Sequence, residues 1–243
     1  MLAIITVSFN SSLDGFRSLR QSQAVSQFIV INNSPPHQNI GFAAGVNKGI
    51  KLAIKRGATE FLLLNPDCRI TPDQVKTLSK TNGDIVAPVL TFRRNGVLIY
   101  DFGGKINWLL GRPTHIERID LAPQRSKDRN RECDYVSGAC MLIRRPVIDR
   151  IGFFDERFFL YFEDADFCRR AKKAGLSVTV NPNVVVPHDI TEHRASRDSF
   201  KLHQVLKSNW IFVKKWIPWY FRPIANLYLL VLGLWVSRFS GYH

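Results

Sequence analysis

Residues 60–67, Glu60-Phe-Leu-Leu-Leu-Asn-Pro-Asp67, combine a short apolar run with a turn that carries an acid. Four consecutive apolar residues bounded by a turn predict a buried strand that ends at Leu64. Pro66 forces the backbone to turn, and Thr71-Pro72 then opens a helix, with Thr as N-cap and Pro at its first position. Strand, polar loop and helix in this order are the repeating unit of an α/β sheet.

The chain on either side repeats this alternation. Further strands are predicted over residues 3–9, 28–31 and 84–89, and helices over residues 13–25 and from a glycine-rich stretch at 39–49 through Lys55. This spacing favours a doubly wound, mostly parallel sheet with helices on both faces. Ligands in such sheets bind beyond the carboxyl ends of the strands. Asn10, Asn32-Asn33 and Asn65-Pro66-Asp67 fall there, so they predict a site.

The composition is that of a basic globular protein. The chain has 243 residues, 34 Lys plus Arg against 20 Asp plus Glu, and a formal net charge of +14. Its length favours one domain, with or without an appendage, and 45% hydrophobic residues exclude a disordered or collagen-like chain. The four cysteines lack CxxC spacing, which favours a reducing, cytosolic setting. The N-terminus lacks the features of a secretory signal, and we expect a first strand there.

The last fifty residues are basic, rich in Trp and apolar towards their end. Such a tail fits an anionic membrane surface. Two alternatives stay open, a C-terminal helix packed on the protein with a solvated basic face and a homodimer interface. A transmembrane span needs about 20 apolar residues, and Pro218, Arg222 and Pro223 interrupt residues 217–236, so we expect peripheral attachment. Nucleic acid also suits a basic chain, but the sequence has no zinc-finger or RRM signature.

Carboxylates interleaved with aromatic residues form the strongest chemical signal, between Gly152 and Arg170. Glu163 and Asp164 open a predicted helix, where the helix dipole favours the ionised form that a base needs. Aromatic walls raise a carboxyl pKa towards the range of a general base. Helix capping and salt bridges to arginine are the alternative, and we favour it for Asp166.

Asp67 and His188 form a candidate metal pair. Asp67 follows a strand and can hold a hard divalent cation such as Mg²⁺ or Mn²⁺, which prefers oxygen ligands and bridges phosphates. His188 follows another apolar run and can complete the site with a neutral imidazole. A turn-forming Asp and a structural His are the alternatives. Gly41, Gly45 and Gly49 match no phosphate-binding motif, so we favour close helix packing for them.

Five motifs, taken in order, resemble those of family 2 glycosyltransferases, most closely the rhamnosyltransferase-like branch that builds bacterial surface polysaccharides. They are VSFN at 7–10, NIGFAAGVN at 39–47, LLNPD at 63–67, SGACMLIR at 137–144 and FFDERFFLYFEDAD at 153–166. The resemblance covers roughly residues 1–215. It implies a GT-A fold and inverting transfer of a sugar from a nucleoside diphosphate donor to an acceptor hydroxyl.

The resemblance also implies residue roles. Asp67 matches the last acid of the DXD-equivalent motif, which reaches the diphosphate through Mg²⁺ or Mn²⁺, and His188 matches a histidine of the metal shell. Asp164 matches the general base. Donor contacts are implied for Ser8, Asn10, Asn32, Asn39, Gly41, Asn47, Asn65 and Asp67, and acceptor contacts for Gly138, Glu163 and Asp166. The family commonly has a base-reading Asp where this chain has Asn32, or Ile31 in another alignment, which leaves dTDP- and UDP-sugars both open.

We therefore expect a nucleotide-sugar-binding half at residues 1–90, an acceptor-binding and catalytic half at 91–215, and a membrane-associating tail at 216–243. Within the second half, residues 91–133 are expected to form a hairpin and a mobile loop over the site. The expected function is metal-dependent transfer of rhamnose or a related hexose to a lipid-linked or growing glycan, by a cytoplasmic protein peripheral at the inner face of the cell membrane. The alternative is a non-catalytic GT-A-fold scaffold in a polysaccharide assembly complex.

Overall fold

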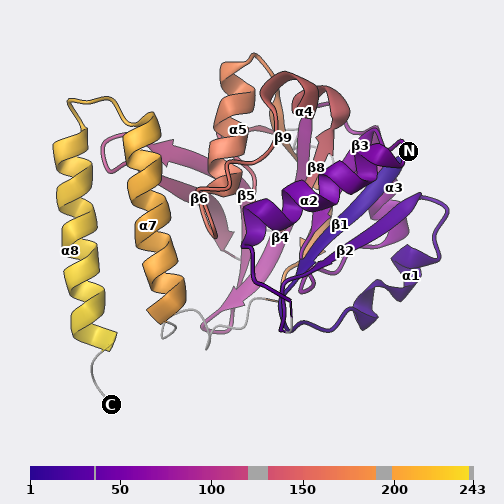
Figure 1. Ribbon diagram of the computed structural model, residues 1–243, viewed down its shortest axis with the longest axis horizontal. Helices are drawn as coiled ribbons and strands as arrows, with labels where there is room; N and C mark the ends of the chain where they lie inside the picture. The colour runs from indigo at the N-terminus through magenta and orange to yellow at the C-terminus, as the bar shows by residue number, and fades with distance from the viewer. Residues whose placement is uncertain (36, 120–130, 190–198, 241–243) are drawn as a thin grey trace.

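The computed structural model describes residues 1–35, 37–119, 131–189 and 199–240 (Figure 1). Its strands are β1 (Leu2–Ser8), β2 (Gln27–Asn32), β3 (Glu60–Leu64), β4 (Ile85–Arg94), β5 (Val97–Asn107), β6 (Arg112–Ile119), β7 (Arg131–Glu132), β8 (Cys140–Arg144) and β9 (Val178–Pro187). Its helices are the 3-10 turn η1 (Asp14–Phe16), α1 (Arg17–Arg20), α2 (Phe42–Lys55), α3 (Pro72–Lys80), α4 (Arg145–Ile151), α5 (Glu163–Lys173), α7 (Ser199–Trp216) and α8 (Arg222–Ser240).

The strands form one mixed sheet in the order β2-β1-β3-β8-β4-β5-β6, with β9 paired to β4 and β7 paired to β9. β1 runs parallel to β2 and β3. β8 lies antiparallel between β3 and β4, so β4 and its parallel neighbour β9 run in the direction of the first three strands. Among the described strands, β1, β2, β3, β4 and β9 thus share one direction, which β6 shares as well, and the predicted mostly parallel α/β fold is confirmed. Antiparallel β5 and β6 extend the far edge.

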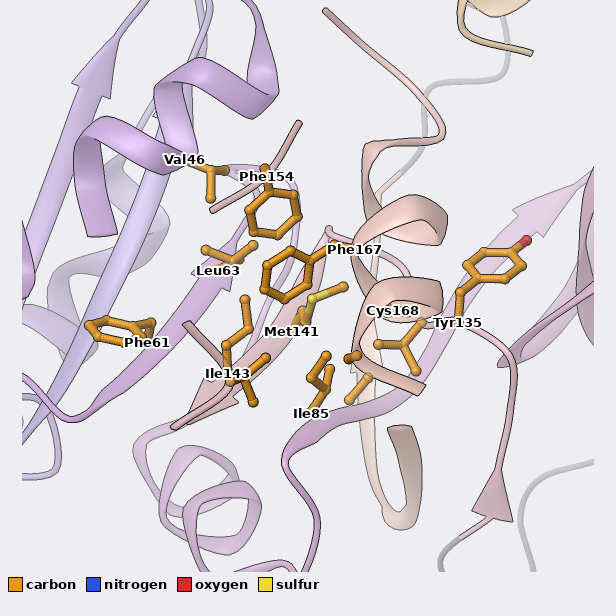
Figure 2. Close-up of a cluster of buried hydrophobic side chains, with 14 of the residues drawn as sticks. Val46, Phe61, Leu63, Ile85, Tyr135, Met141, Ile143, Phe154, Phe167 and Cys168 are labelled. Carbon is orange, nitrogen blue, oxygen red and sulfur yellow. The ribbon is translucent and has the colours of Figure 1, made fainter. Parts of the chain in front are cut away.

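Alternate side chains of the central strands build a core on each face of the sheet. Ile5 and Leu63 belong to the core that α2, α4 and α5 cover, part of which Figure 2 shows. Ile4 and Leu62 belong to the core that η1, α1 and α3 cover. Helices therefore lie on both faces, as the alternation of strands and helices predicts.

Helix α2 approaches β1 closely because two of its glycines face the strand. A Cβ at Gly49 would lie 2.4 Å from Ile5 Cγ2, and one at Gly45 would lie 2.9 Å from Val7 Cγ1. Close packing, the favoured interpretation of this glycine repeat, is confirmed at these two positions. The packing brings the N-terminal end of α2 to the carboxyl ends of β1 and β2.

The first helix is shorter than predicted. In place of one helix over residues 13–25, η1 is followed by a single helical turn, α1. The Ser22 hydroxyl accepts a hydrogen bond from the Ala24 amide at 3.1 Å, and such local bonds compete with helical ones. The predicted cap of α3 is confirmed, since Thr71 and Gln74 form a reciprocal capping box.

The segment after β4 contains two antiparallel hairpins, β4–β5 and β5–β6, where one was predicted. Residues 120–130, which include most of the expected mobile loop, lie outside the described residues. The turn between β5 and β6 packs under the C-terminal helices, because a Cβ at Gly111 would lie 2.6 Å from Val213 Cγ2.

Helices α7 and α8 form the outermost layer at the β6 edge of the sheet (Figure 1). The two helices share a small buried cluster, which contains Val213 of α7, Ile217 just after α7 and Ala225 of α8. The opposite face of α8 exposes a continuous row of apolar side chains, here called the α8 stripe: Ile224, Leu227, Leu230, Val231 and Leu234. Among the described helices, none has the length and hydrophobicity needed to cross a bilayer.

Candidate active site

Two adjoining pockets lie at the carboxyl ends of the parallel strands and share Phe42, Asn65 and Leu160 as lining residues. The first, about 680 Å³ in volume, is lined by residues that follow β1, β2 and β3, and we call it the strand-end pocket. The second, about 400 Å³, contains Glu163 and Asp164, and we call it the carboxylate pocket. Two ligands can therefore bind at once, one in each pocket, with their reactive groups in contact where the pockets adjoin.

Four of the residues expected to bind a donor line the strand-end pocket: Asn39, Gly41, Asn65 and Asp67. Asn39 Oδ1 accepts a hydrogen bond from the Gly41 amide at 3.0 Å. Gly41 has φ +84°, and a Cβ there would lie 2.6 Å from the Phe159 carbonyl oxygen. Glycine therefore lets the backbone enter α2 in contact with the loop that leads to Glu163.

Of the Asn32-Asn33 pair that was predicted to lie at this strand end, Asn33 lines the strand-end pocket, whereas the donor contact was expected from Asn32. Asn33 is buried, and its Nδ2 donates to the Gly41 carbonyl at 3.0 Å. Its Oδ1 is buried without a hydrogen-bond partner among the described residues. Asn32 is exposed, and its Oδ1 accepts from the Ser34 amide at 2.9 Å. The alternation of buried and exposed residues along β2 is the signal that distinguishes the two.

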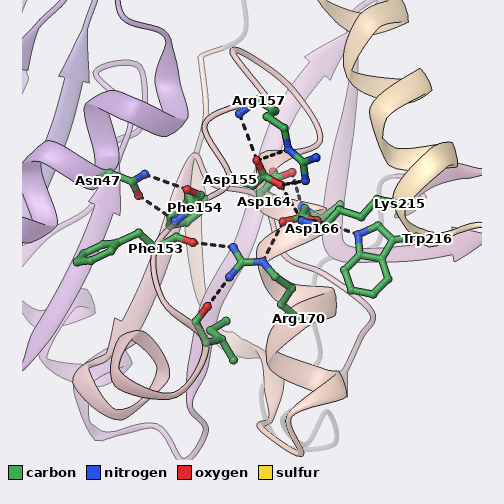
Figure 3. A network of polar contacts seen from close by, with 12 residues as sticks. Asn47, Phe153, Phe154, Asp155, Arg157, Asp164, Asp166, Arg170, Lys215 and Trp216 are labelled. Atoms are coloured by element: carbon green, nitrogen blue, oxygen red, sulfur yellow. Dashed lines mark hydrogen bonds and ion pairs between the residues drawn. The ribbon is translucent and has the colours of Figure 1, made fainter.

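Three other expected donor residues hold the walls of the site instead of lining it. Ser8 Oγ donates to the Ser11 carbonyl at 3.4 Å, and the Asn10 amide donates to Ser34 Oγ at 2.6 Å, so both fix the loop after β1. Asn47 is buried on α2 and bonds both the amide and the carbonyl of Phe154 at 2.9 Å (Figure 3). The structure gives Asn47 the role of a clamp between α2 and the segment that precedes α5.

Asp67 and His188 come together where the two pockets meet, as expected for a shared metal site. Asp67 Oδ1 lies 3.3 Å from His188 Nε2. Backbone bonds between residues 67–69 and 187–189 hold the two side chains in place, including Asp189 amide to Asp67 carbonyl at 2.9 Å. A carboxylate oxygen and an imidazole nitrogen at this distance fit a single divalent cation. Cys68 Sγ is nearby, but burial raises the pKa of its thiol, so it stays protonated.

Glu163 and Asp164 enter the carboxylate pocket at the start of α5. The chain reaches them through Tyr161 and Phe162, whose φ angles are +69° and +67°. Left-handed backbone at such residues costs on the order of 1 kcal/mol each. The left-handed backbone at these two residues directs the two carboxylates into the pocket.

Hydrogen bonds and burial set the chemistry of these carboxylates. Asp164 Oδ2 accepts from the Gly138 amide at 3.0 Å, and Oδ1 accepts from the Ala165 amide at 2.7 Å. Burial nevertheless raises the pKa of Asp164 above its usual range, with these amides partly opposing the shift. Burial also raises the pKa of Glu163, and the charge of Asp164 adds to the shift. Glu163 Oε2 is buried with no hydrogen-bond partner in the described part of the chain.

Asp166, expected to contact an acceptor, lies in a buried network behind the pocket (Figure 3). Its Oδ2 accepts from Arg170 at 3.0 Å, and its Oδ1 accepts from Trp216 Nε1 at 2.8 Å and Lys215 at 2.7 Å. Lys215 also lies 2.7 Å from Asp155. Asp166 therefore takes the salt-bridge role that was the favoured alternative, and the network fastens α7 to the segment around α5.

Sequence motifs did not indicate the β6 wall of the carboxylate pocket, which Arg112 and His115 form. His115 Nδ1 lies 2.8 Å from the buried carboxylate of Asp101. Burial lowers the pKa of His115, but the hydrogen bond and charge of Asp101 outweigh it, so the net shift is upward. The Arg112 guanidinium is hydrogen-bonded to the Tyr228 hydroxyl of α8. No short motif marks these positions, because only the folded chain brings β6 beside the segment that carries Glu163 and Asp164.

The sequence and the fold of this chain are similar to those of known glycosyltransferases. A family model described as "Glycosyltransferase like family 2" matches residues 114–212, which include His115, Glu163, Asp164 and His188. The crystal structure of GalNAc-T7 with UDP, GalNAc and Mn²⁺ superposes with a TM-score of 0.61 at 13% identity, covering 89% of this chain and 48% of that one. The expected fold class and the resemblance to family 2 glycosyltransferases are both confirmed.

Among characterised proteins, the chain is similar to a hexosyltransferase and to a rhamnosyltransferase. The low-salt glycan biosynthesis hexosyltransferase Agl10 of Haloferax volcanii is 27% identical over 201 residues, which cover 73% of this chain and 63% of that protein. The N-acetylglucosaminyl-diphospho-decaprenol L-rhamnosyltransferase of Mycobacterium tuberculosis is 39% identical over 92 residues, 37% of this chain and 29% of that protein. The chain thus spans less than two thirds of the length of each of these relatives.

Proposed function

We propose that the chain is an inverting, metal-dependent glycosyltransferase. It moves rhamnose or a related hexose from a dTDP- or UDP-sugar to a lipid-linked or growing glycan. The observation that carries this proposal is the junction of two pockets, with the Asp67–His188 pair at the junction and the Asp164 carboxylate in the second pocket. An inverting displacement at a sugar carbon needs a site for the leaving group and a base on the opposite side of that carbon. The Asp67–His188 pair supplies the first and Asp164 supplies the second.

In this proposal the donor occupies the strand-end pocket and the acceptor occupies the carboxylate pocket. Asn33, Asn39 and Gly41 surround the nucleoside end of the donor. Asp67 and His188 hold Mg²⁺ or Mn²⁺, which when bound neutralises the charge on the departing diphosphate. Residues 1–90 supply most of the donor wall, and residues 91–215 supply the base and most of the acceptor wall.

Asp164 is the proposed general base. It accepts the proton of the acceptor hydroxyl while the hydroxyl oxygen bonds to the anomeric carbon and the bond from that carbon to the diphosphate breaks. The Gly138 amide orients the carboxylate, and the raised pKa of Asp164 makes it a stronger base than an exposed aspartate. The unpartnered Glu163 Oε2 is placed to accept a hydrogen bond from an acceptor hydroxyl.

The α8 stripe supports the proposal that the protein binds the inner face of the cell membrane peripherally. Beside the stripe, Trp219 and Tyr220 are exposed at the turn before α8. Lys214 lies over the ring of the exposed Trp210, and Arg222 opens α8. Apolar side chains, interfacial aromatics and cations on one layer suit an anionic lipid surface. Membrane binding of this kind would bring a lipid-linked acceptor close to the carboxylate pocket.

The donor site is tested by thermal melts with dTDP, UDP and GDP and their sugars, each with and without Mn²⁺. A ligand at a hundred times its Kd adds about 2.7 kcal/mol to the free energy of unfolding, which a melt resolves. We expect one base to stabilise the protein in a Mn²⁺-dependent manner, and Asp67→Ala to remove the Mn²⁺ dependence. Absence of any nucleotide shift in folded protein would favour the non-catalytic scaffold instead.

The base is tested by Asp164→Asn. This variant should retain the nucleotide-dependent shift in the melt and lose at least about a hundredfold in turnover, the contribution typical of general base catalysis. Ser137→Ala, a change at another residue that lines the same pocket, should keep turnover within a few-fold. Turnover equal to that of the parent protein in Asp164→Asn would remove Asp164 as the base.

Membrane binding is tested by sedimentation with vesicles of anionic phospholipid. Leu227→Glu with Leu230→Glu should abolish sedimentation, whereas Val97→Glu, an apolar-to-acid change on the β4–β5 hairpin, should leave it unchanged. Undiminished sedimentation of the double variant would exclude the α8 stripe as the membrane contact.

A further inference from the structure

The β6 wall of the carboxylate pocket carries positive charge that the proposed chemistry does not use. Arg112 and His115 both line this pocket, and neither lines the strand-end pocket. No carboxylate within the described ranges forms an ion pair with Arg112, whose guanidinium bonds the Tyr228 hydroxyl. His115 is oriented by Asp101 through Nδ1, so its Nε2 is the nitrogen left for a ligand. A guanidinium and an imidazole in one pocket are the groups that bind phosphate.

We infer that Arg112 and His115 form a subsite for the phosphate group of the acceptor. The inference rests on the proposed function and specifies its acceptor as a sugar joined through phosphate to a hydrocarbon chain. In the described residues the same pocket offers three kinds of surface. Glu163 and Asp164 suit sugar hydroxyls, Arg112 and His115 suit phosphate, and apolar residues that include Leu160, Val205 and Leu232 suit hydrocarbon.

Tyr228 and Leu232 connect this subsite to the C-terminal layer. Both belong to α8, one turn apart, and both are half-buried, whereas the side chains of the α8 stripe are exposed. Tyr228 holds the guanidinium of Arg112, and Leu232 lines the pocket. The helix proposed to lie on the membrane therefore also forms a wall of the acceptor pocket. A chain anchored in the bilayer beside α8 would place its phosphate near Arg112.

The diphosphate of the nucleotide donor is the other phosphate available to this protein. Two observations separate it from the subsite. The donor residues Asn33, Asn39 and Gly41 line the other pocket. Asp67, which with His188 is suited to the donor diphosphate, lines that other pocket as well, whereas Arg112 and His115 come from β6 at the edge of the sheet and share a pocket with His188 alone of the pair. The subsite is therefore assigned to the acceptor phosphate.

The test measures equilibrium binding of farnesyl diphosphate, below its micellar concentration, by isothermal titration calorimetry. Farnesol and the nucleoside diphosphate that stabilises the protein serve as the two comparison ligands. Arg112→Gln should weaken farnesyl diphosphate binding at least about tenfold, as loss of a charge-assisted hydrogen bond would. Its affinity for farnesol and for the nucleotide should stay within about twofold. His115→Asn, whose amide can still bond Asp101, and Tyr228→Phe should produce the same selective loss to a smaller extent.

Arg93→Gln is the matched control, because Arg93 is an exposed arginine that bonds the Gly96 carbonyl at the β4–β5 turn. It should bind all three ligands like the parent protein. Unchanged farnesyl diphosphate affinity in Arg112→Gln would overturn the subsite, as would an equal loss of nucleotide affinity, which would assign Arg112 to the donor. The readout is binding, so it stands apart from the proposed activity. Selective loss in a protein without turnover would keep the subsite while removing the enzyme.

Discussion

Lys215 Nζ lies 2.7 Å from Asp155 Oδ2 and 2.7 Å from Asp166 Oδ1, so one cation on α7 joins two carboxylates on either side of the Glu163–Asp164 pair. Asp166 is fully buried, and the arginine and lysine charges around Asp155 hold the pKa of that carboxyl well below its usual range. The loop that positions the proposed base is thus fixed to the C-terminal layer by buried charge.

Lys215→Met should therefore lower the free energy of unfolding by about 2–3 kcal/mol, because it leaves buried carboxylates with fewer partners. Lys214→Met is the matched control. Lys214 is exposed, and its ammonium group lies over the face of Trp210; its carbonyl accepts from Arg222, a bond that the substitution keeps, so a loss below about 1 kcal/mol is expected. Chemical denaturation measures the free energy of unfolding of both variants. Equal stability losses would mean that the Lys215 pairs contribute little.

The packing of α2 on β1 gives a second prediction. Gly49→Ala should destabilise the protein by about 1–3 kcal/mol, because its Cβ would lie 2.4 Å from Ile5 Cγ2 in a packed core. Gly15→Ala should be neutral or stabilising, since a Cβ there meets nothing within 4 Å. Thermal melts of the two variants provide the comparison. An unchanged melt for Gly49→Ala would show that α2 shifts away from the sheet at little cost.

The arrangement of strands and helices was largely predictable because its signals are local. Four consecutive apolar residues before Asn65, and the Thr71-Pro72 cap, are contained within a few positions of the chain. The length of α1 was not predictable in this way, since hydrogen bonds of Ser22 compete with the helix. Nor was the insertion of β8 between β3 and β4, which joins segments far apart in sequence.

The site was predictable in part, because motif positions do not determine which way a side chain faces. Asp164 and Asp166 are two residues apart on α5, which rotates them by about 200° around the helix axis. Only Asp164 therefore reaches the pocket, while Asp166 meets α7. Similarly, Asn32 and Asn33 point to opposite sides of the chain after β2. Arg112 and His115 depend on the placement of β6, for which the sequence offers no motif.

Asn33 and Asn32 supply a third, paired prediction about the donor base. Asn33→Ala should weaken binding of the preferred nucleoside diphosphate about tenfold, as expected for loss of one well-formed hydrogen bond and of the contact to the Gly41 carbonyl. Asn32→Ala, on the exposed side, should change the affinity less than about twofold. Titration calorimetry with Mn²⁺ present measures both. A larger effect at Asn32 would restore it as the residue that contacts the base.

The buried carboxylate of Glu163 yields the last prediction, a pH dependence of stability. Burial raises the pKa of Glu163 in the folded state above its unfolded value. Proton binding therefore favours folding, and the stability contributed by the protonated form is lost as pH rises through the folded-state pKa. Glu163→Gln removes the charge while keeping the shape. The variant should be more stable than the parent protein by about 1–3 kcal/mol at about pH 8, the penalty of an unpartnered buried group. The difference should vanish below about pH 3, where the carboxyl is protonated in both states.

Denaturation at a series of pH values measures this difference, with Glu132→Gln on β7 as an exposed control that should show none. A constant difference across the pH range would mean that Glu163 titrates alike in the folded and unfolded protein. If the expected dependence is found, the binding of an acceptor that donates a hydrogen bond to Glu163 Oε2 should reduce it, because the bound hydroxyl supplies the missing partner of the charged form.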